Sequence, residues 1–418
     1  MRVTRLKINR FRHVQPNTEL EFGSTFNILL GRNAAGKTTL LEVIAAITND
    51  DLSIFRNDPD GFDLEYELVD DVEAKGAIQV AVRRDRAKVQ VSSKTSKREP
   101  QFEAPLHAGS ADRFEEAATV HYVRDGSIAW QCTVADRTVR IVGGPDLKLT
   151  DDPSESSFRL GLFVSIAQED EVLRSTPNAL MSLLVASFGK RAGRFDEADE
   201  SLRRIFGFRL APPKVPFTEG WPREILTIAA KANLEGDVLQ ISSQESKTLA
   251  EIATVLNFGS VSLQAPVLAR SEGELTIGSP RFTLKQDAHT SIGHELLSFG
   301  QRRLLAFIWY LGIRQTMPVT ADELVNGFHH EWIELCVDRL RATQSFLATQ
   351  NPLLLDQLPV SGETEAASVF IRCEVRSVEH SQVMSWRRFT EAEARRLRAA
   401  REVGIQSVSE VLRFEGLW

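Results

Sequence analysis

The chain lacks a membrane-length apolar run, cysteine clusters and any excess of basic residues. No stretch reaches about eighteen consecutive apolar residues, and the first residues lack the apolar segment of a signal peptide. Cys132, Cys336 and Cys373 are scattered without metal-ligand spacing, which fits a reducing compartment. A net charge of −7 argues against a protein that coats DNA but leaves room for a local basic groove. We therefore expect a cytoplasmic protein without a membrane segment.

Long heptad repeats are also missing, which excludes a head domain interrupted by a long coiled-coil arm. What is present is ordinary for a globular protein. The 418 residues are 42% hydrophobic and 26% charged, so the chain is able to bury a large core.

The most informative motif spans Gly31–Thr39. It follows an apolar run at Phe26–Leu30, which gives the order strand, GxxxxGK[ST] loop, helix. Glycines let backbone N–H groups wrap phosphates, Lys37 would reach the β- and γ-phosphates, and the Thr38 hydroxyl would bind Mg²⁺. The following helix, to about Ile47, points its positive end at the anion. The motif predicts nucleoside triphosphate binding by Gly31, Arg32, Asn33, Ala34, Ala35, Gly36, Lys37, Thr38 and Thr39.

Three later segments follow this loop in a fixed order: Glu295–Phe307, Val319–Leu324 and Ser345–Asp356. They resemble the signature, Walker B and switch segments of ABC-type ATPases. Val3–Arg12 is similar to the first strand of the RecF/SMC/OLD branch of that family, and not to the transporters. The resemblance covers roughly residues 1–48 and the chain from 290 onward, and it implies ATP as the substrate and Mg²⁺ as the cofactor.

The resemblance implies an α/β fold, a P-loop NTPase of the ABC-ATPase head type. Strand-like alternation from about 62 to 145 predicts an antiparallel β lobe beside it. Helical spacings from about 175 to 208, at Ile225–Ala232 and at Thr248–Leu256 predict an inserted helical lobe.

We therefore divide the chain into three parts. Residues 1–165 form an N-terminal ABC lobe with the phosphate loop and the antiparallel sheet. Residues 166–290 form a helical or mixed insertion lobe. Residues 291–418 form a C-terminal ABC lobe with the signature, Walker B and switch segments and the terminal helices.

The signature turn has two readings. By resemblance, Ser298, Gly300 and Gln301 grip the γ-phosphate of an ATP that is held on a second protomer. From the residues alone, Ser298 is a helix N-cap in front of an apolar helix.

The Asp322–Glu323 pair also has two readings. By resemblance, Asp322 holds Mg²⁺ and Glu323 polarises the attacking water. Without the resemblance, the pair is an exposed strand end. Pro318 cannot donate to a central strand ladder, so the strand is short or begins at Val319.

Two positions depart from the family pattern or are hard to place. The family has a His where this chain has Gln350, whose amide can donate to a γ-phosphate but cannot titrate, so turnover is expected to be slow. Gln168, after the apolar stretch Phe163–Ala167, is the candidate for the Mg²⁺-sensing glutamine that joins the core to the inserted lobe.

The resemblance implies two ATPs sandwiched in a homodimer or higher homo-oligomer. Only about sixty residues follow Asp356, too few for the nuclease domain of OLD-type proteins, so we expect a separate effector protein, a nuclease or toxin. Short heads of this kind commonly act in bacterial anti-phage defence. Two alternatives stay open: a RecF-like DNA-repair ATPase, and an ATP-gated scaffold with little turnover.

Nucleic-acid contact depends on two basic clusters, which are either solvated faces or contacts to a phosphate backbone. One cluster is Arg83, Arg84, Arg86 and Lys88. The other, expected on a C-terminal helix capped by Thr390 and Glu393, is Arg387, Arg388, Arg395, Arg396, Arg398 and Arg401.

Overall fold

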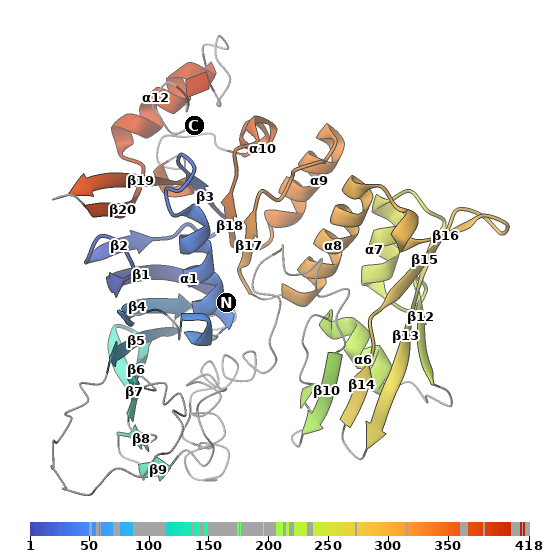
Figure 1. The fold of residues 1–418 in the computed structure, drawn as a ribbon, viewed down its shortest axis with the longest axis horizontal. Coiled ribbons are helices and arrows are strands. Elements are labelled where there is room, and N and C mark those ends of the chain that lie inside the picture. Colours follow the sequence, from blue (N-terminus) through green and yellow to red (C-terminus); the bar gives the residue numbers. More distant parts are fainter. Residues whose placement is uncertain are drawn as a thin grey trace, which may run out of the picture.

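The computed structural model contains three sheets. Figure 1 shows strands of one of them, together with helices, between the other two sheets. The structure describes residues 1–49, 52–55, 58, 60–69, 76–86, 114–135, 138–142, 146–148, 174, 176, 195, 206–211, 215–216, 221–231, 237–271, 274–314, 317–359, 367–378, 381–402, 410–411 and 413. None of the helices within these ranges is long and apolar enough to span a membrane.

The central five-stranded sheet carries the phosphate loop. Its order is β17-β18-β3-β19-β20, with parallel pairing from β17 to β19 and an antiparallel β20. The strands are β17 (Val319–Asp322), β18 (Ser345–Ala348), β3 (Phe26–Leu30), β19 (Phe370–Val378) and β20 (Ser381–Arg388). Every residue of β3 is buried, as expected for a strand in the middle of a sheet that is covered on both faces.

Helices cover both faces of this sheet. Helix α1 (Lys37–Asn49) packs on the face that includes Leu29, while α8 (Phe299–Arg314) and α9 (His330–Leu340) pack on the face that includes Ile28 and Leu30. Alternate residues of one strand thus serve opposite layers. Two shorter helices are η2 (His294–Leu296), which precedes α8 in the chain, and α10 (Pro352–Gln357), which contacts α9.

The antiparallel sheet predicted for the N-terminal lobe is confirmed, and it has eight strands. Its order is β2-β1-β4-β5-β6-β7-β8-β9. A row of cross-strand neighbours belongs to the same hydrophobic core as α1, and it consists of Leu6, Tyr66, Val80, Val120 and Cys132. The bounds are β1 (Arg2–Phe11), β2 (Thr18–Glu21), β4 (Phe62–Val69), β5 (Gly76–Arg86), β6 (Phe114–Arg124), β7 (Ser127–Ala135), β8 (Thr138–Ile141) and β9 (Asp146–Lys148), with η1 (Leu52–Phe55) beside them.

The inserted lobe contains the expected helices α6 (Arg223–Lys231) and α7 (Lys247–Val255), together with a seven-stranded antiparallel sheet that the sequence did not indicate. Its strands are β10 (Phe206–Ala211), β11 (Val215–Pro216), β12 (Val238–Ser242), β13 (Ser260–Ser271), β14 (Glu274–Ile277), β15 (Arg281–Lys285) and β16 (Ser291–Gly293).

The helical assignment was wrong at its end, because β10 begins at Phe206, where a short apolar run fits either period. The rest of 175–208 lies outside the described residues, apart from Thr176 and Phe195. The three-part division at 165 and 290 stays a prediction.

The C-terminal helix α12 (Glu391–Glu402) begins with the expected capping box. Thr390 Oγ1 accepts from the N–H of Glu393, and the Glu393 carboxylate accepts from the N–H of Thr390 at 2.8 Å. The placement of Arg387 and Arg388 on this helix was wrong. Both end strand β20, because the Thr390 cap starts the helix only after them.

Candidate functional site

The phosphate loop lies between the buried end of β3 and the first turn of α1. Gly36 has a φ of +80° and Ala34 a φ of +63°, so the chain makes a left-handed turn there that costs Ala34 about 1–2 kcal/mol. A Cβ at Gly31 would overlap the carbonyl oxygen of Cys373, and one at Gly36 would overlap Met384 Sδ. Gly31 is therefore required by the close approach of β19, and Gly36 by its left-handed φ.

Lys37 begins α1 and folds back over the loop. Its ammonium group donates to the carbonyls of Gly31 at 2.7 Å and Arg32 at 3.1 Å, and the residue is only 8% exposed. A desolvated ammonium at the start of a helix is the donor type that binds phosphate oxygens strongly.

Thr38 and Asp322 meet although they are far apart in sequence. The Thr38 hydroxyl donates to Asp322 Oδ2 at 2.6 Å, because α1 starts beside the carboxyl end of β17. A hydroxyl and one carboxylate fit Mg²⁺, which in proteins takes few protein ligands and keeps waters or phosphate oxygens. These residues would hold the ion; Gln168 lies outside the described residues.

Glu323 directly follows β17 in a strained conformation, with a φ of +50°. Its backbone N–H donates to Ala348 at 2.8 Å, and its carboxylate accepts from the N–H of Gln350 at 3.3 Å. Burial raises the pKa of Glu323 above its ordinary value, and the neighbouring Asp322 carboxylate acts in the same direction. A carboxylate with a raised pKa is a better proton acceptor for a water molecule.

Arg303 is hydrogen-bonded to the backbone of this strained residue. It lies on α8, and its guanidinium donates to the carbonyl of Glu323 at 2.6 Å and to that of Leu324 at 2.9 Å. The guanidinium also stacks over the ring of Phe195 at 4.8 Å. The signature helix is thereby bonded to the backbone of the candidate catalytic residue.

The side chain of Gln350 is also engaged. Its amide nitrogen donates to Asn33 Oδ1 in the phosphate loop, so the switch segment and the loop touch directly. The amide of Gln350 thus lies beside the phosphate loop.

These groups surround one cavity of about 830 Å³. Its lining is Asn33, Ala34, Ala35, Gly36, Lys37, Thr38, Thr39, Asp322, Glu323, Asn326, Gln350, Asn351, Pro352 and Met384. The structure thus brings the phosphate loop, Walker B pair and switch glutamine together. Gly31 and Arg32 lie at the loop's entry, outside this lining.

The signature residues are elsewhere. Ser298 caps α8 in the structure: its hydroxyl accepts from the N–H of Gln301 at 3.3 Å, and Gln301 Oε1 accepts from the N–H of Ser298 at 3.0 Å. Gly300 packs against the carbonyl of Gly327, where a Cβ would approach to 2.7 Å. Neither Ser298, Gly300 nor Gln301 lines the cavity, and the adjacent Phe299 is 60% exposed.

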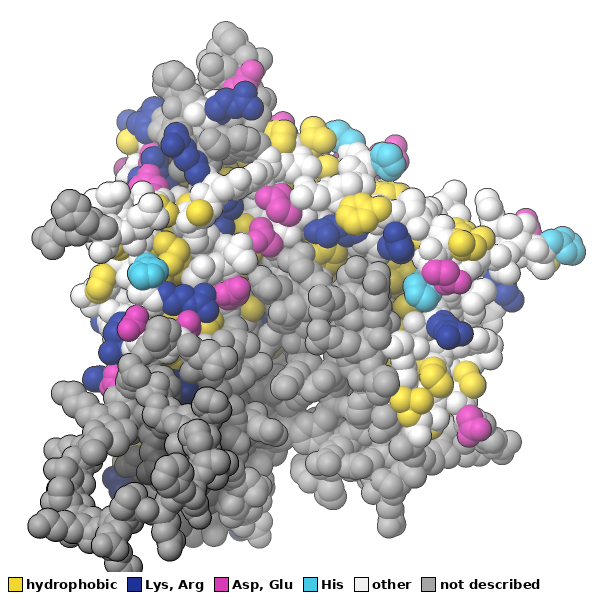
Figure 2. Space-filling view, in the orientation of Figure 1, with side chains coloured by type: hydrophobic (Ala, Val, Ile, Leu, Met, Phe, Trp, Pro, Cys, Tyr) yellow, Lys and Arg dark blue, Asp and Glu magenta, His cyan; other side chains and the backbone are white. Residues whose placement is uncertain are grey.

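Two arginines of the expected basic clusters are shown paired with acids, and one of them is Arg387, which contacts Glu393 at 2.7 Å. Arg83 contacts Asp85 at 2.5 Å, and Arg10 contacts the same carboxylate. Figure 2 shows Lys and Arg mixed with Asp and Glu on the visible face. Lys88 and the side chains of Arg86, Arg398 and Arg401 lie outside the described part of the chain.

Sequence reasoning missed Arg303, Met384 and Asn326 as parts of this site. Arg303 stood in the signature segment without a role, because its partners are backbone carbonyls some twenty residues away. Met384 reaches Gly36 across the sheet, and no local pattern marks such a contact.

The fold and the site have the arrangement of a P-loop NTPase, with a phosphate loop between a buried parallel strand and a helix. Residues 5–126 match the AAA domain family. No curated protein matches the chain.

Solved structures similar to the chain include heads of SMC proteins. One is an Smc head bound to the C-winged helix domain of ScpA, at 11% identity and TM-score 0.41, covering 93% of this chain and 99% of that one. Another is the SMC head domain from Thermotoga maritima, at 11% identity and TM-score 0.34, covering 93% and 100%. A third is an Smc head with an extended coiled coil bound to the C-terminal domain of ScpA derived from Pyrococcus furiosus. It has 11% identity and a TM-score of 0.37, and the match covers 96% of this chain and 99% of that one. At these scores the assignment of residues rests on the chain's own geometry.

Proposed function

We propose that the chain binds and hydrolyses ATP as an ABC-type ATPase and that two copies close around the nucleotide. The observation that carries this proposal is the single cavity in which Lys37, Thr38, Asp322 and Glu323 meet. These four residues have the chemistry that phosphoryl transfer needs: a phosphate-binding ammonium, two oxygen ligands for Mg²⁺ and a carboxylate that accepts a proton from water.

The residues divide the work. Lys37 and the loop N–H groups bind and orient the phosphates, and Thr38 with Asp322 would hold Mg²⁺, which neutralises charge on the phosphates when bound. Glu323 accepts a proton from water, helped by the burial that raises its pKa. Arg303 keeps the Glu323 backbone in place.

The location of the signature turn supports dimerisation. Ser298 is exposed and lies outside the chain's own cavity, beside the exposed Leu296 and Phe299, so its hydroxyl is available to the cavity of a second copy. ATP bound in one copy would then be completed by the other.

The output of this cycle is proposed to be control of a separate effector protein, a nuclease or toxin, in bacterial anti-phage defence. This part rests on the resemblance to short heads of the RecF/OLD-like kind. The RecF-like alternative would use the basic clusters for contact with DNA, and Arg83 of the first cluster contacts Asp85.

A second function, an ATP-gated scaffold with little turnover, is favoured by one observation. Gln350 stands in the histidine position and is engaged by Asn33. An amide donates a hydrogen bond but takes up no proton, so ATP sensing is possible with slow hydrolysis.

One experiment separates these possibilities. The solution mass of Glu323→Gln is measured with and without ATP and Mg²⁺, beside the turnover of the wild type. ATP-driven dimers of the variant together with wild-type turnover support the ATPase cycle. ATP-driven dimers without wild-type turnover favour the scaffold, and a mass that ignores ATP in a protein that does not bind it contradicts both.

A further inference from the structure

The β19–β20 hairpin contacts the phosphate loop near the loop's beginning and near its end. Arg372 pairs in register with Leu30, the last residue before the loop, and the carbonyl of Cys373 abuts Gly31. At the other end, Trp386 Nε1 donates to the carbonyl of Ala35 at 3.3 Å. Together with Met384 against Gly36, these contacts make the hairpin the support on which the loop rests.

The opposite face of the hairpin carries two facing arginines. Arg372 and Arg387 are cross-strand partners, one position along from the Cys373–Trp386 pair that touches the loop. Two like charges directly opposite each other destabilise a strand pair unless an opposite charge lies between them.

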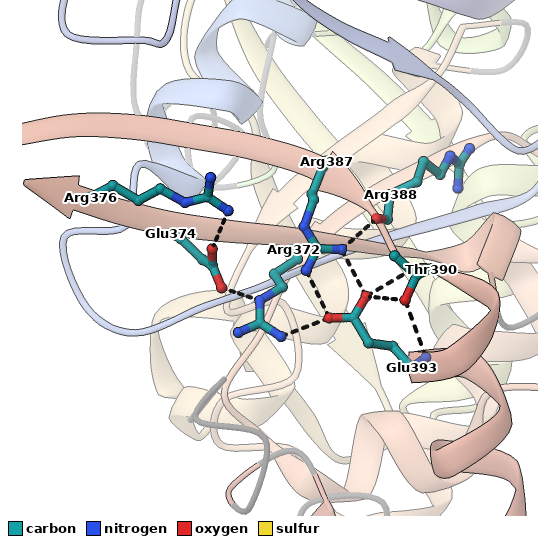
Figure 3. A network of polar contacts seen from close by, with 7 residues as sticks. All are labelled: Arg372, Glu374, Arg376, Arg387, Arg388, Thr390 and Glu393. Atoms are coloured by element: carbon teal, nitrogen blue, oxygen red, sulfur yellow. Dashed lines mark hydrogen bonds and ion pairs between the residues drawn. The ribbon is translucent and has the colours of Figure 1, made fainter. Parts of the chain in front are cut away.

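Glu393, in the first turn of α12, supplies that charge (Figure 3). Its carboxylate accepts from Arg372 at 2.7 Å and from both terminal nitrogens of Arg387 at 2.7 and 2.8 Å. The same carboxylate accepts from the N–H and the hydroxyl of Thr390 at 2.8 and 3.0 Å. One side chain therefore caps the helix and clamps both strands of the hairpin.

The clamp is buried and stays charged. Glu393 is only 7% exposed, and the hydrogen bonds from Arg387 hold its pKa well below the ordinary range of a glutamate. On the outer side, Glu374 contacts Arg372 and Arg376, so the network continues along β19 (Figure 3). Removal of the Glu393 charge therefore removes the ion pair between Arg387 and Glu393.

We propose that Glu393 is a positioning residue for the phosphate loop. It docks α12 on the hairpin, and the hairpin in turn fixes the loop through Cys373, Met384 and Trp386. The inference rests on the proposed function in one respect: the loop's conformation is taken to set nucleotide affinity. Since linkage is reciprocal, nucleotide binding must then strengthen the docking of α12.

The first arm of the test needs no nucleotide. Amide hydrogen exchange is measured in wild type and Glu393→Gln at Ala35 and Leu40, whose N–H groups donate within the loop and the first turn of α1. We expect about tenfold faster exchange in the variant, because the support of the loop has moved. Glu251→Gln is the matched control, since it breaks an ion pair with Arg339 at 2.9 Å on the remote α7–α9 surface, and it should leave loop exchange unchanged.

The second arm measures ATP affinity in the same proteins. Glu393→Gln should weaken binding about tenfold, while Leu263→Ala, a core variant of the inserted lobe that lowers stability, should change it by less than about twofold. Weaker binding in both variants would mean that loss of stability alone causes the effect, and the inference would fail.

Several outcomes are decisive. Unchanged loop exchange in Glu393→Gln, with α12 exchanging faster, overturns the inference. Faster loop exchange in a protein whose wild type binds no ATP supports the coupling and refutes the proposed function instead. If Glu393→Gln does not fold, Glu393→Asp keeps the charge but shortens its reach, and it should shift loop exchange in the same direction by about threefold; no shift there overturns the inference as well.

Discussion

The phosphate loop and the signature turn use the same chemistry, polar groups at the start of a helix, in opposite situations. The phosphate loop opens into a cavity with Asp322 and Glu323. The signature turn at Ser298 instead satisfies its own helix and faces outward beside the exposed Phe299.

In the proposed dimer, one chain therefore holds a binding site and only part of a catalytic site. The two regions are joined by Arg303, which extends from the signature helix to the backbone of Glu323. A ligand that moves the outward turn would therefore also act on the catalytic residue through α8. Variants on each side should separate binding from turnover.

The largest effect is expected for Lys37→Ala. The variant removes a buried ammonium from the phosphate loop, so ATP affinity should fall about a hundredfold, or ~2.7 kcal/mol. Titration with a fluorescent ATP analogue measures the change, with Lys247→Ala as an exposed control. An affinity within about twofold of wild type would remove Lys37 from the site.

Ser298→Asp tests the outward half alone. Aspartate caps a helix as well as serine, so stability should hold, but its charge would repel a γ-phosphate offered by a second copy. We expect turnover to fall about thirtyfold while ATP binding to the single chain changes little. Ser298→Ala, by contrast, should cost about 1 kcal/mol of stability. Equal turnover in Ser298→Asp and wild type would make the turn a helix cap and nothing more.

Arg303→Gln tests the link between the two regions. Without the guanidinium, the backbone carbonyls of the strained Glu323 and of Leu324 each lose a hydrogen bond, and turnover should fall about tenfold with ATP affinity preserved. The exposed neighbour provides the control variant, Arg302→Gln. If both variants slow turnover equally, surface charge rather than positioning is responsible.

The smallest effect is expected for Gln350→His. A histidine donates to the γ-phosphate and also titrates, so turnover should rise about threefold and acquire a pH dependence near pH 6.5 that wild type lacks. Steady-state turnover across pH 5.5–8, about one unit on each side, checks this. A lower rate at every pH would show that the Gln350–Asn33 contact is itself needed.

Local patterns predicted the parts of the molecule that depend on neighbours in sequence. The phosphate loop, the α8 cap at Ser298 and the start of β17 after Pro318 all follow from turn, cap and proline rules. The alternating strands of the first lobe were visible for the same reason, because each strand pairs with the next in sequence.

The rest depends on contacts that no local period encodes. Strand β13 pairs with β12 and β15 along its first half and with β14 along its second half, and no local pattern shows which strands become its partners. The Met384 support of Gly36 joins residues from opposite ends of the chain. Arg387 looked like a helical surface charge, and only the fold reveals that it faces Glu393 across a strand end.

The central position of β3 has a consequence for biosynthesis. Its two neighbours in the sheet, β18 and β19, are translated about 300 residues later, which at ribosomal rates means on the order of 15–60 seconds. During that interval the apolar segment Phe26–Leu30 has left the ribosome with both edges unpaired, while the hairpins of the first lobe can already form. The nucleotide site is thus among the last parts of the chain to assemble, and the nascent protein passes through a period in which a chaperone has an open strand to bind.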